Sequence, residues 1–215
     1  MARTGRNRVS RKEAHAHYHS TIHDLGERGD AVKKEILGSR ADYACFIIDR
    51  NINFTNICAA ECDFCAFYRE KDDPEAFTLT VDEILEKVRD LKKIGGTQVM
   101  IQGGIHERYD LAFYKEIFSA IKTTFPDIYI HSCSPAEIDS LAKREKKSVF
   151  DTIVELKEAG LQSLPGVAEI LVDKHRAKVS PRKLKSREWI EVMEGIHRAG
   201  MRATATMTFG MGESL

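Results

Sequence analysis

The sequence predicts an α/β protein built as a partial (β/α) barrel, preceded by helices and incomplete after about strand five. Two observations support this fold class. Short β-rich segments alternate with helical segments of about 10–15 residues, which is typical of parallel βα units. Polar side chains and paired glycines also gather where the predicted strands end, as at 102-QGG-104. In α/β barrels the chemistry collects at the carboxyl ends of the strands, so we expect the functional site there.

The first 43 residues are expected to form a helical extension. Ser10 and Glu13 have the spacing of a capping box, which predicts a helix from there to about Leu25. Residues 30–37 are expected to form a second, shorter helix. This region therefore precedes the barrel.

The barrel core, predicted over residues 44–215, begins with the β-rich segment 44-ACFIIDRNINFTNIC-58. Side chains with a period of two lie on opposite faces of a strand. One set becomes more polar toward the carboxyl end and is expected to face the barrel interior; the other set is apolar. The first set is Ile47, Asp49, Asn51, Asn53 and Thr55, and the second is Phe46, Ile48, Ile52 and Phe54.

The remaining elements alternate along the chain. Thr80 and Glu83 form a second capping box, and Gly95-Gly96 end the helix that follows it. Further strands are expected at 97–104, 127–134, within 161–170 and at 202–209. The intervening helices are expected at 80–93, 109–124, 135–143, 148–160 and 187–199.

Composition excludes several classes of function. The chain has 215 residues, enough for a sizeable core, and its 33 basic and 33 acidic residues balance. This balance gives no support for a nucleic-acid or anionic-membrane partner. No apolar run approaches the length of about 20 residues that spans a bilayer, and no apolar stretch follows the basic N-terminus to make a signal peptide. Five cysteines do not suggest a disulfide framework, so we expect a cytoplasmic protein whose thiols stay available.

The segment 55-TNICAAECDFCAFYRE-70 carries the strongest signal, because it holds three of the five cysteines with the spacing C-x3-C-x2-C. Clustered core cysteines are one interpretation, but the neighbouring Glu61 and Asp63 are poor core residues. A structural zinc site is a second, although such sites usually have four ligands and no fourth cysteine is near. A four-iron cluster held by Cys58, Cys62 and Cys65 is the third, and it leaves one iron open for chemistry.

The motif, with Phe64 just before its last cysteine, resembles that of the radical S-adenosylmethionine (radical SAM) superfamily. Longer stretches, among them "DRNIN", "CAFYR", "IQGG" and "HSCSPAEI", resemble the subgroup that acts in the futalosine route to menaquinone and in deazaflavin synthesis. Within it the cyclic dehypoxanthinyl futalosine synthase family is the most similar. Aminofutalosine synthases and the deazaflavin synthase component are its neighbours and remain alternatives.

The resemblance implies a [4Fe–4S] cluster on the three cysteines, with S-adenosyl-L-methionine (SAM) on the open iron. It also implies a reducing electron donor, a small nucleoside-like substrate, and radical chemistry that closes a ring on that substrate. The residues implied for SAM are Phe64, Phe67, Tyr68, Gly103, Gly104 and Glu169. Strand alternation adds candidate substrate-binding residues, namely Asn51, Asn53, Thr55, Ser134, Thr204 and Thr206.

Three features depart from the family pattern. The segment 165-PGVAE-169 is one residue shorter than the usual glycine-rich loop, and Met211 stands where a histidine is usual. Related enzymes also continue beyond the fifth strand. We therefore expect a C-terminally incomplete barrel that is completed by further chain or by a second polypeptide, with little turnover alone. A cluster-binding electron carrier and an inactive fragment are rival hypotheses, but a carrier needs neither the SAM-side glycines nor Glu169.

Overall fold

The computed structural model describes residues 9–213. Its internal contacts divide the chain into two units, with the boundary in the sequence between Phe46 and Ile47. The sequence placed this boundary after residue 43. No helix among the described residues is both long enough and apolar enough to cross a membrane.

The described part of the first unit consists of α1 (Arg11–Tyr18), α2 (Ile22–Leu37) and a short 3-10 turn (Gly38–Arg40). The capping box of Ser10 and Glu13 is present as predicted. The expected helix to Leu25 and the separate helix over 30–37 are wrong, because the chain breaks after Tyr18 and one helix runs from Ile22 to Leu37. A second capping box explains the break: the Thr21 side chain accepts from the Asp24 amide, and the Asp24 carboxylate accepts from the Thr21 amide.

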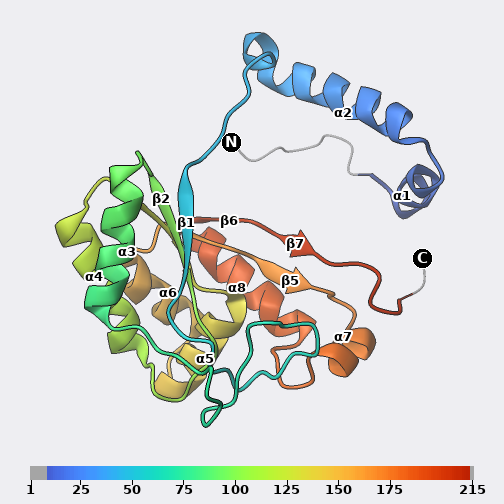
Figure 1. Ribbon diagram of the computed structural model, residues 1–215. Coiled ribbons are helices and arrows are strands. Elements are labelled where there is room, and N and C mark those ends of the chain that lie inside the picture. The colour runs from blue at the N-terminus through green and yellow to red at the C-terminus, as the bar shows by residue number, and fades with distance from the viewer. Residues whose placement is uncertain (1–8, 214–215) are drawn as a thin grey trace. The chain divides into compact units, whose positions relative to one another are not determined.

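The second unit contains a five-stranded, wholly parallel sheet in the order β1-β2-β3-β4-β6 (Figure 1). Its strands are β1 (Asp49–Asn53), β2 (Gln98–Gln102), β3 (Tyr129–Ser132), β4 (Ser163–Leu164) and β6 (Arg202–Ala203). Strands adjacent in the sheet follow one another along the chain with helices between them. The α/β partial barrel predicted from the sequence is thereby confirmed.

A separate pair of parallel strands, β5 (Val167–Glu169) and β7 (Thr206–Met207), extends beyond the main sheet. The single strands predicted within 161–170 and at 202–209 are each divided in two. Gly166 lies at the division, where a Cβ atom would stand 1.8 Å from the carbonyl oxygen of Thr204. The two segments approach too closely there for any side chain, and the ladder is interrupted.

The first strand is shorter than predicted, because regular pairing with β2 begins only at Asp49. Ile52 and Phe54 are buried as expected. Phe46 and Ile48, predicted for the same apolar face, are 84% and 37% exposed. They precede the strand, so the alternation that applies to Ile52 does not extend to them.

Helices α3 (Val81–Lys93), α4 (Leu111–Thr124), α5 (Pro135–Glu145), α6 (Val149–Glu158) and α8 (Ser186–Arg198) follow the predicted ranges closely. They form one layer, in which α4 packs against α3 and α6, and α5 packs against α6 and α8. Capping boxes at Thr80 and Ser134 begin two of them. The short α7 (Asp173–Val179) was not predicted, since its N-cap residue, Val172, makes no side-chain hydrogen bond.

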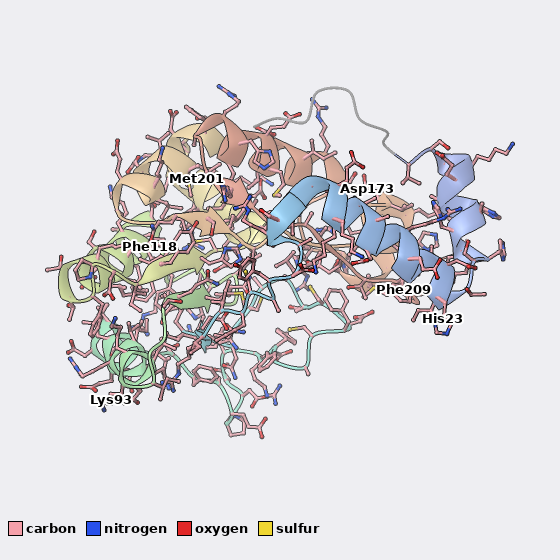
Figure 2. The ribbon with its side chains drawn as sticks, turned by 90° about the horizontal axis from the view of Figure 1, so that it is seen from above. His23, Lys93, Phe118, Asp173, Met201 and Phe209 are labelled. Atoms are coloured by element: carbon pink, nitrogen blue, oxygen red, sulfur yellow. The ribbon has the colours of Figure 1, made fainter. Side chains whose placement is uncertain are left out.

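The hydrophobic core lies between this helical layer and one face of the sheet. Ile101 and Ile130 project from β2 and β3 into it and are fully buried, as is Phe118 of α4. Figure 2 labels Phe118 and Met201 of this core, and also Phe209 near the end of the chain, which is 86% exposed. The opposite face of the sheet carries the alternate side chains and is free of this core.

Candidate functional site

A cavity of about 350 Å³ lies at the carboxyl ends of the parallel strands. Its walls come from the end of β1, the cysteine loop, the segment after β2, the start of α5, and β5. In Figure 1 the long segment between β1 and α3 lies at this end of the sheet. The rule that α/β barrels place chemistry at strand carboxyl ends therefore points to this cavity.

All three motif cysteines line the cavity. Cys58 and Cys62 are half-buried and Cys65 is exposed. Burial raises the pKa of the Cys62 thiol to about 11, while the positive charge of Lys183 opposes the shift. Within residues 9–213, no three His, Cys, Asp or Glu side chains already stand close enough together to hold a metal ion. The three sulfurs thus share a cavity without converging on one point, and in a four-iron cluster each thiolate binds a different iron.

Backbone contacts hold the cysteine loop in place although no helix or strand forms between β1 and α3. The Ala59 amide donates to the Ile105 carbonyl (2.8 Å) and the Asp63 amide to the Val179 carbonyl (2.9 Å), both within the segment from Cys58 to Cys65. The Arg69 amide donates to the Asn56 carbonyl (2.9 Å) and closes the loop around that segment. The position of the three cysteines is therefore set by contacts with distant parts of the chain.

The environment of Cys58 suits a thiolate ligand. Its Sγ accepts hydrogen bonds from the Ile105 amide (3.2 Å) and the Ala60 amide (3.4 Å). Amide donors of this kind stabilise negative charge on sulfur and are typical of iron–sulfur sites. Three thiols facing one cavity, with such donors already in place, fit a four-iron cluster with one open iron.

Gly104 brings the cysteine loop against the end of β2. A Cβ atom on Gly104 would lie 2.1 Å from the Ile57 carbonyl oxygen and 2.7 Å from Cβ of Cys58. Gly103 is equally close to its neighbours, since a Cβ atom there would lie 2.2 Å from the Phe54 ring. Both glycines line the cavity, and both are required by packing whatever ligand they meet.

Glu137 is a cavity residue that sequence reasoning missed. Its side chain accepts hydrogen bonds from the Gly103 amide (3.1 Å), the Tyr114 hydroxyl (3.0 Å) and the Ser134 amide (2.6 Å). Burial raises the pKa of this carboxyl group, and the donors of Ser134, Gly103 and Tyr114 oppose the rise. The S-P-A-E capping-box pattern was the available signal, but it says nothing of Gly103 or Tyr114.

Glu169 lies in a buried group of three charges. Its Oε2 is 3.3 Å from Nη1 of Arg176, and its Oε1 accepts from the Lys183 ammonium group. The three side chains are only 3–11% exposed. The other terminal nitrogen of Arg176, Nη2, is buried without a hydrogen-bond partner among the described residues. The sequence indicated Glu169 alone; no local pattern pointed to Lys183, which also lines the cavity.

The aromatic residues predicted beside SAM form part of the cavity wall. Phe64 and Phe67 are 41% and 67% exposed, and Tyr68 is half-buried. The large exposed area of the two phenylalanines places them at the rim of the cavity. Their role as SAM contacts stays a prediction.

The predicted substrate residues separate into two groups. Asn51, Asn53, Thr55 and Ser134 line the cavity. The Thr55 hydroxyl, however, donates to the Phe77 carbonyl (2.9 Å), and that of Ser134 accepts from the Glu137 amide (3.2 Å), so both already have structural partners.

Thr204 and Thr206 do not reach the cavity. Both are exposed, and their side chains bond Gly166: Thr204 Oγ1 accepts from its amide (3.1 Å), and Thr206 Oγ1 donates to its carbonyl (3.4 Å). They bridge the two divided strands. Met211, at the family's histidine position, is half-buried, and its amide donates to the Glu213 carboxylate (2.7 Å).

Comparison with known proteins gives one family. The sequence pattern of the radical SAM superfamily matches residues 52–215. A cyclic dehypoxanthine futalosine synthase of Streptomyces coelicolor is 40% identical over 195 residues, which cover 90% of this chain and 49% of that protein. A 5-amino-6-(D-ribitylamino)uracil–L-tyrosine 4-hydroxyphenyl transferase of Methanococcus maripaludis is 41% identical over 191 residues, which cover 87% and 52%. This chain spans about half the length of these curated relatives.

Solved structures share the fold at low sequence identity. A methylornithine synthase superposes with a TM-score of 0.75 and 16% identity, covering 97% of this chain and 58% of its own. A maturase of the [FeFe]-hydrogenase superposes with a TM-score of 0.70 and 17% identity, covering 94% and 44%. These similarities concern the architecture alone.

Proposed function

This chain belongs to the radical SAM superfamily, and we propose that it cyclises dehypoxanthine futalosine to cyclic dehypoxanthinyl futalosine in menaquinone biosynthesis. The observation that supports the proposal most directly is the shared cavity. The three cysteines, the Gly103–Gly104 segment, Glu169 and the polar end of β1 all line it. A relative that is 40% identical over 90% of this chain has a name that includes this synthase activity.

In the proposed enzyme Cys58, Cys62 and Cys65 hold the [4Fe–4S] cluster, and the adjoining cavity holds SAM. When bound, cluster and SAM supply a 5′-deoxyadenosyl radical, which removes a hydrogen atom from the substrate. The protein's own contribution is placement. Gly104 lets the cysteine loop approach the strand end, and the polar residues of β1 orient the substrate beside it.

The charged groups of the cavity suit a zwitterionic ligand such as SAM. Lys183 and Glu169 both line the cavity, whereas Arg176 lies behind Glu169 and donates to the carbonyls of Ala168, Ile170 and Leu184. We propose that the Lys183 ammonium group faces the carboxylate of the ligand, and that Glu169, held in place by Arg176, contacts the ligand from the same wall of the cavity.

A second candidate reaction is 4-hydroxyphenyl transfer from tyrosine to 5-amino-6-(D-ribitylamino)uracil. Relatives with that name are 37–41% identical to this chain, as similar as the futalosine enzyme. Met211 departs from the pattern of the whole subgroup and does not separate the two reactions. The two candidates share the radical-generating step and differ in what the substrate cavity accepts.

The test is anaerobic reconstitution of the intact enzyme, with whatever further chain or second polypeptide completes the barrel, using iron and sulfide, followed by dithionite, SAM and either dehypoxanthine futalosine or the tyrosine and ribitylaminouracil pair. We expect 5′-deoxyadenosine in every case and a cyclised product only with dehypoxanthine futalosine. Alanine at the three motif cysteines should abolish cluster absorbance and SAM cleavage, whereas Cys45→Ala, an exposed cysteine outside the cavity, should retain both. A product from the tyrosine pair alone would establish the second candidate, and a cluster-loaded protein that forms no 5′-deoxyadenosine would contradict the proposal.

We also expect the protein to lie in the cytoplasm, because a reducing compartment keeps its cysteine thiols free.

A further inference from the structure

A polar row crosses the sheet on the face opposite to the hydrophobic core. The parallel register aligns Asn51 of β1 with Met100 of β2, Met100 with His131 of β3, His131 with Ser163 of β4, and Ser163 with Arg202 of β6. The neighbours of these residues along the strands, such as Ile52, Ile101 and Ile130, are buried in the core. Because side chains alternate along a strand, the five residues of the row, all polar except Met100, face the other side.

His131 and Ser163 form a close pair within this row. A ring nitrogen of His131, Nδ1, lies 2.6 Å from the Ser163 hydroxyl oxygen. The histidine is half-buried and the serine buried. The second ring nitrogen, Nε2, makes no hydrogen bond within residues 9–213 and is not one of the buried atoms without a partner, so it is accessible from outside the protein. The serine holds the ring in place, and an accessible nitrogen of fixed orientation can bind a ligand.

The row is continuous with the cavity. Asn51 belongs to both, and Asn53 and Gln102 line the cavity one layer nearer to the cysteines. Adjacent strands are about 4.8 Å apart, so Asn51 and His131, two strands apart, can contact one ligand about 10 Å long. Such a ligand would extend from the cysteine end of the cavity down onto the sheet.

We propose that His131 is a substrate-contacting residue, and that Asn51, His131 and Ser163 form a subsite for the part of the substrate that carries neutral hydroxyl, carbonyl or amide groups. This inference rests on the proposed function, since it concerns the substrate of the same cavity. Asn51 and Ser163 carry no charge, and burial lowers the pKa of His131, while Asp49 at the lower end of β1 acts in the opposite direction. The three subsite residues therefore offer uncharged hydrogen-bonding groups, and the nearest cation in the register is the exposed Arg202 of β6, beyond Ser163.

Ser163 gives the histidine a dual capacity. When the serine hydroxyl donates to Nδ1, the ring carries its proton on Nε2 and donates to a substrate oxygen. When Nδ1–H donates to the serine oxygen, Nε2 accepts from a substrate hydroxyl or amine. A single pair can thus recognise a group that donates or one that accepts.

The experiment uses His131→Gln, Ser163→Ala and a control, His197→Gln, which removes an exposed histidine on α8. Iron-free protein labelled at histidine Cε1 is titrated by NMR with dehypoxanthine futalosine, and separately with tyrosine plus 5-amino-6-(D-ribitylamino)uracil. The resonance absent from His131→Gln identifies residue 131, and we expect it to shift with one of these probes. The His197 resonance should not move.

Reconstituted protein supplies the second measurement. We expect His131→Gln to raise KM for the substrate roughly tenfold and to lower the amount of product formed per 5′-deoxyadenosine. Ser163→Ala should raise KM by a smaller factor, and His197→Gln should match the wild type. An unmoved residue-131 resonance with every probe, or an unchanged KM in His131→Gln, overturns the inference. Absence of 5′-deoxyadenosine from wild-type protein instead counts against the proposed function, so the two failures are distinguishable.

Discussion

Replacing Glu169 by glutamine changes the balance of a buried charge group and gives the most quantitative test of the site. Wild-type protein holds two cations, Arg176 and Lys183, around one carboxylate, with all three side chains at most 11% exposed. Glutamine keeps the shape and removes the charge. Two buried cations then face each other without a counter-ion.

The cost follows from the burial. Removing one partner of a buried ion pair typically costs about 3–5 kcal/mol, because the remaining charge is left uncompensated. Domains have about 5–15 kcal/mol of stability in total, so Glu169→Gln should fold but with much less margin. At roughly 2–4 °C per kcal/mol for a chain of this size, the melting temperature should fall by about 6–20 °C.

Lys183→Met provides the matched comparison. It removes one cation and leaves Glu169 paired with Arg176 at 3.3 Å, so it should cost less than Glu169→Gln. The double variant should be more stable than the sum of the single losses implies, with a coupling of about 0.5–3 kcal/mol. Urea and thermal unfolding of iron-free protein measure all three variants.

The same variants test the proposed contact with SAM. Both should weaken SAM binding, by about 1–3 kcal/mol for Glu169→Gln if its carboxylate contacts the ligand. The reasoning is refuted if Glu169→Gln costs less than about 1 kcal/mol of stability, or if Lys183→Met is the more damaging change.

Three further predictions concern single residues. Gly104→Ala should lower the free energy of unfolding by about 1–3 kcal/mol and disturb the cysteine loop, because its Cβ would lie 2.1 Å from a carbonyl oxygen. Gly26→Ala, inside α2 with open space around it, should instead raise that free energy by up to about 1 kcal/mol, and urea unfolding of both variants measures the difference. Tyr114→Phe removes one of three donors to the Glu137 carboxylate and should cost about 1.5–3 kcal/mol in urea unfolding, and no measurable loss would show that the other two donors suffice. Because burial lowers the pKa of His131 in the folded protein, the unfolded chain binds a proton at this residue more readily, and the free energy of unfolding should fall as the pH drops below about 6.5. His131→Gln should flatten that part of the curve of stability against pH, and an unchanged slope would contradict the prediction.

Local signals in the sequence predicted the elements that depend on local contacts. Thr80 and Glu83 cap a helix through their own hydrogen bonds, so a stretch of four residues is enough to predict where it begins. The polar face of β1 was likewise readable from its alternation, and Asn51 and Asn53 line the cavity. Thr21 and Asp24 show the limit of such reasoning, because the second capping box that divides the N-terminal helices was present in the sequence and overlooked.

Contacts between distant segments account for what the sequence did not reveal. Thr204 and Thr206 have the alternation of lining residues, but the close approach at Gly166 turns them to a structural role. Lys183 reaches Glu169 across fourteen positions that include α7, and Glu137 contacts Gly103 only because α5 begins beside the end of β2. Neither side-chain periodicity nor motif spacing in the sequence predicts contacts of this kind.

The order of strands in the main sheet also has a consequence for how the protein folds. Each strand pairs with the strands that precede and follow it in that sheet, so every pairing closes a loop of roughly 30 to 50 residues. Closure entropy grows only logarithmically with loop length, and these pairings therefore differ in entropic cost by less than about 0.6 kcal/mol. No single strand pair is favoured to form first by topology alone. The sheet can grow one βα unit at a time as the chain leaves the ribosome. The pairing of β3 with β4 has the shortest register, the single pair His131–Ser163, so β4 gains its stable place in the sheet only when β6 pairs with it on the other side.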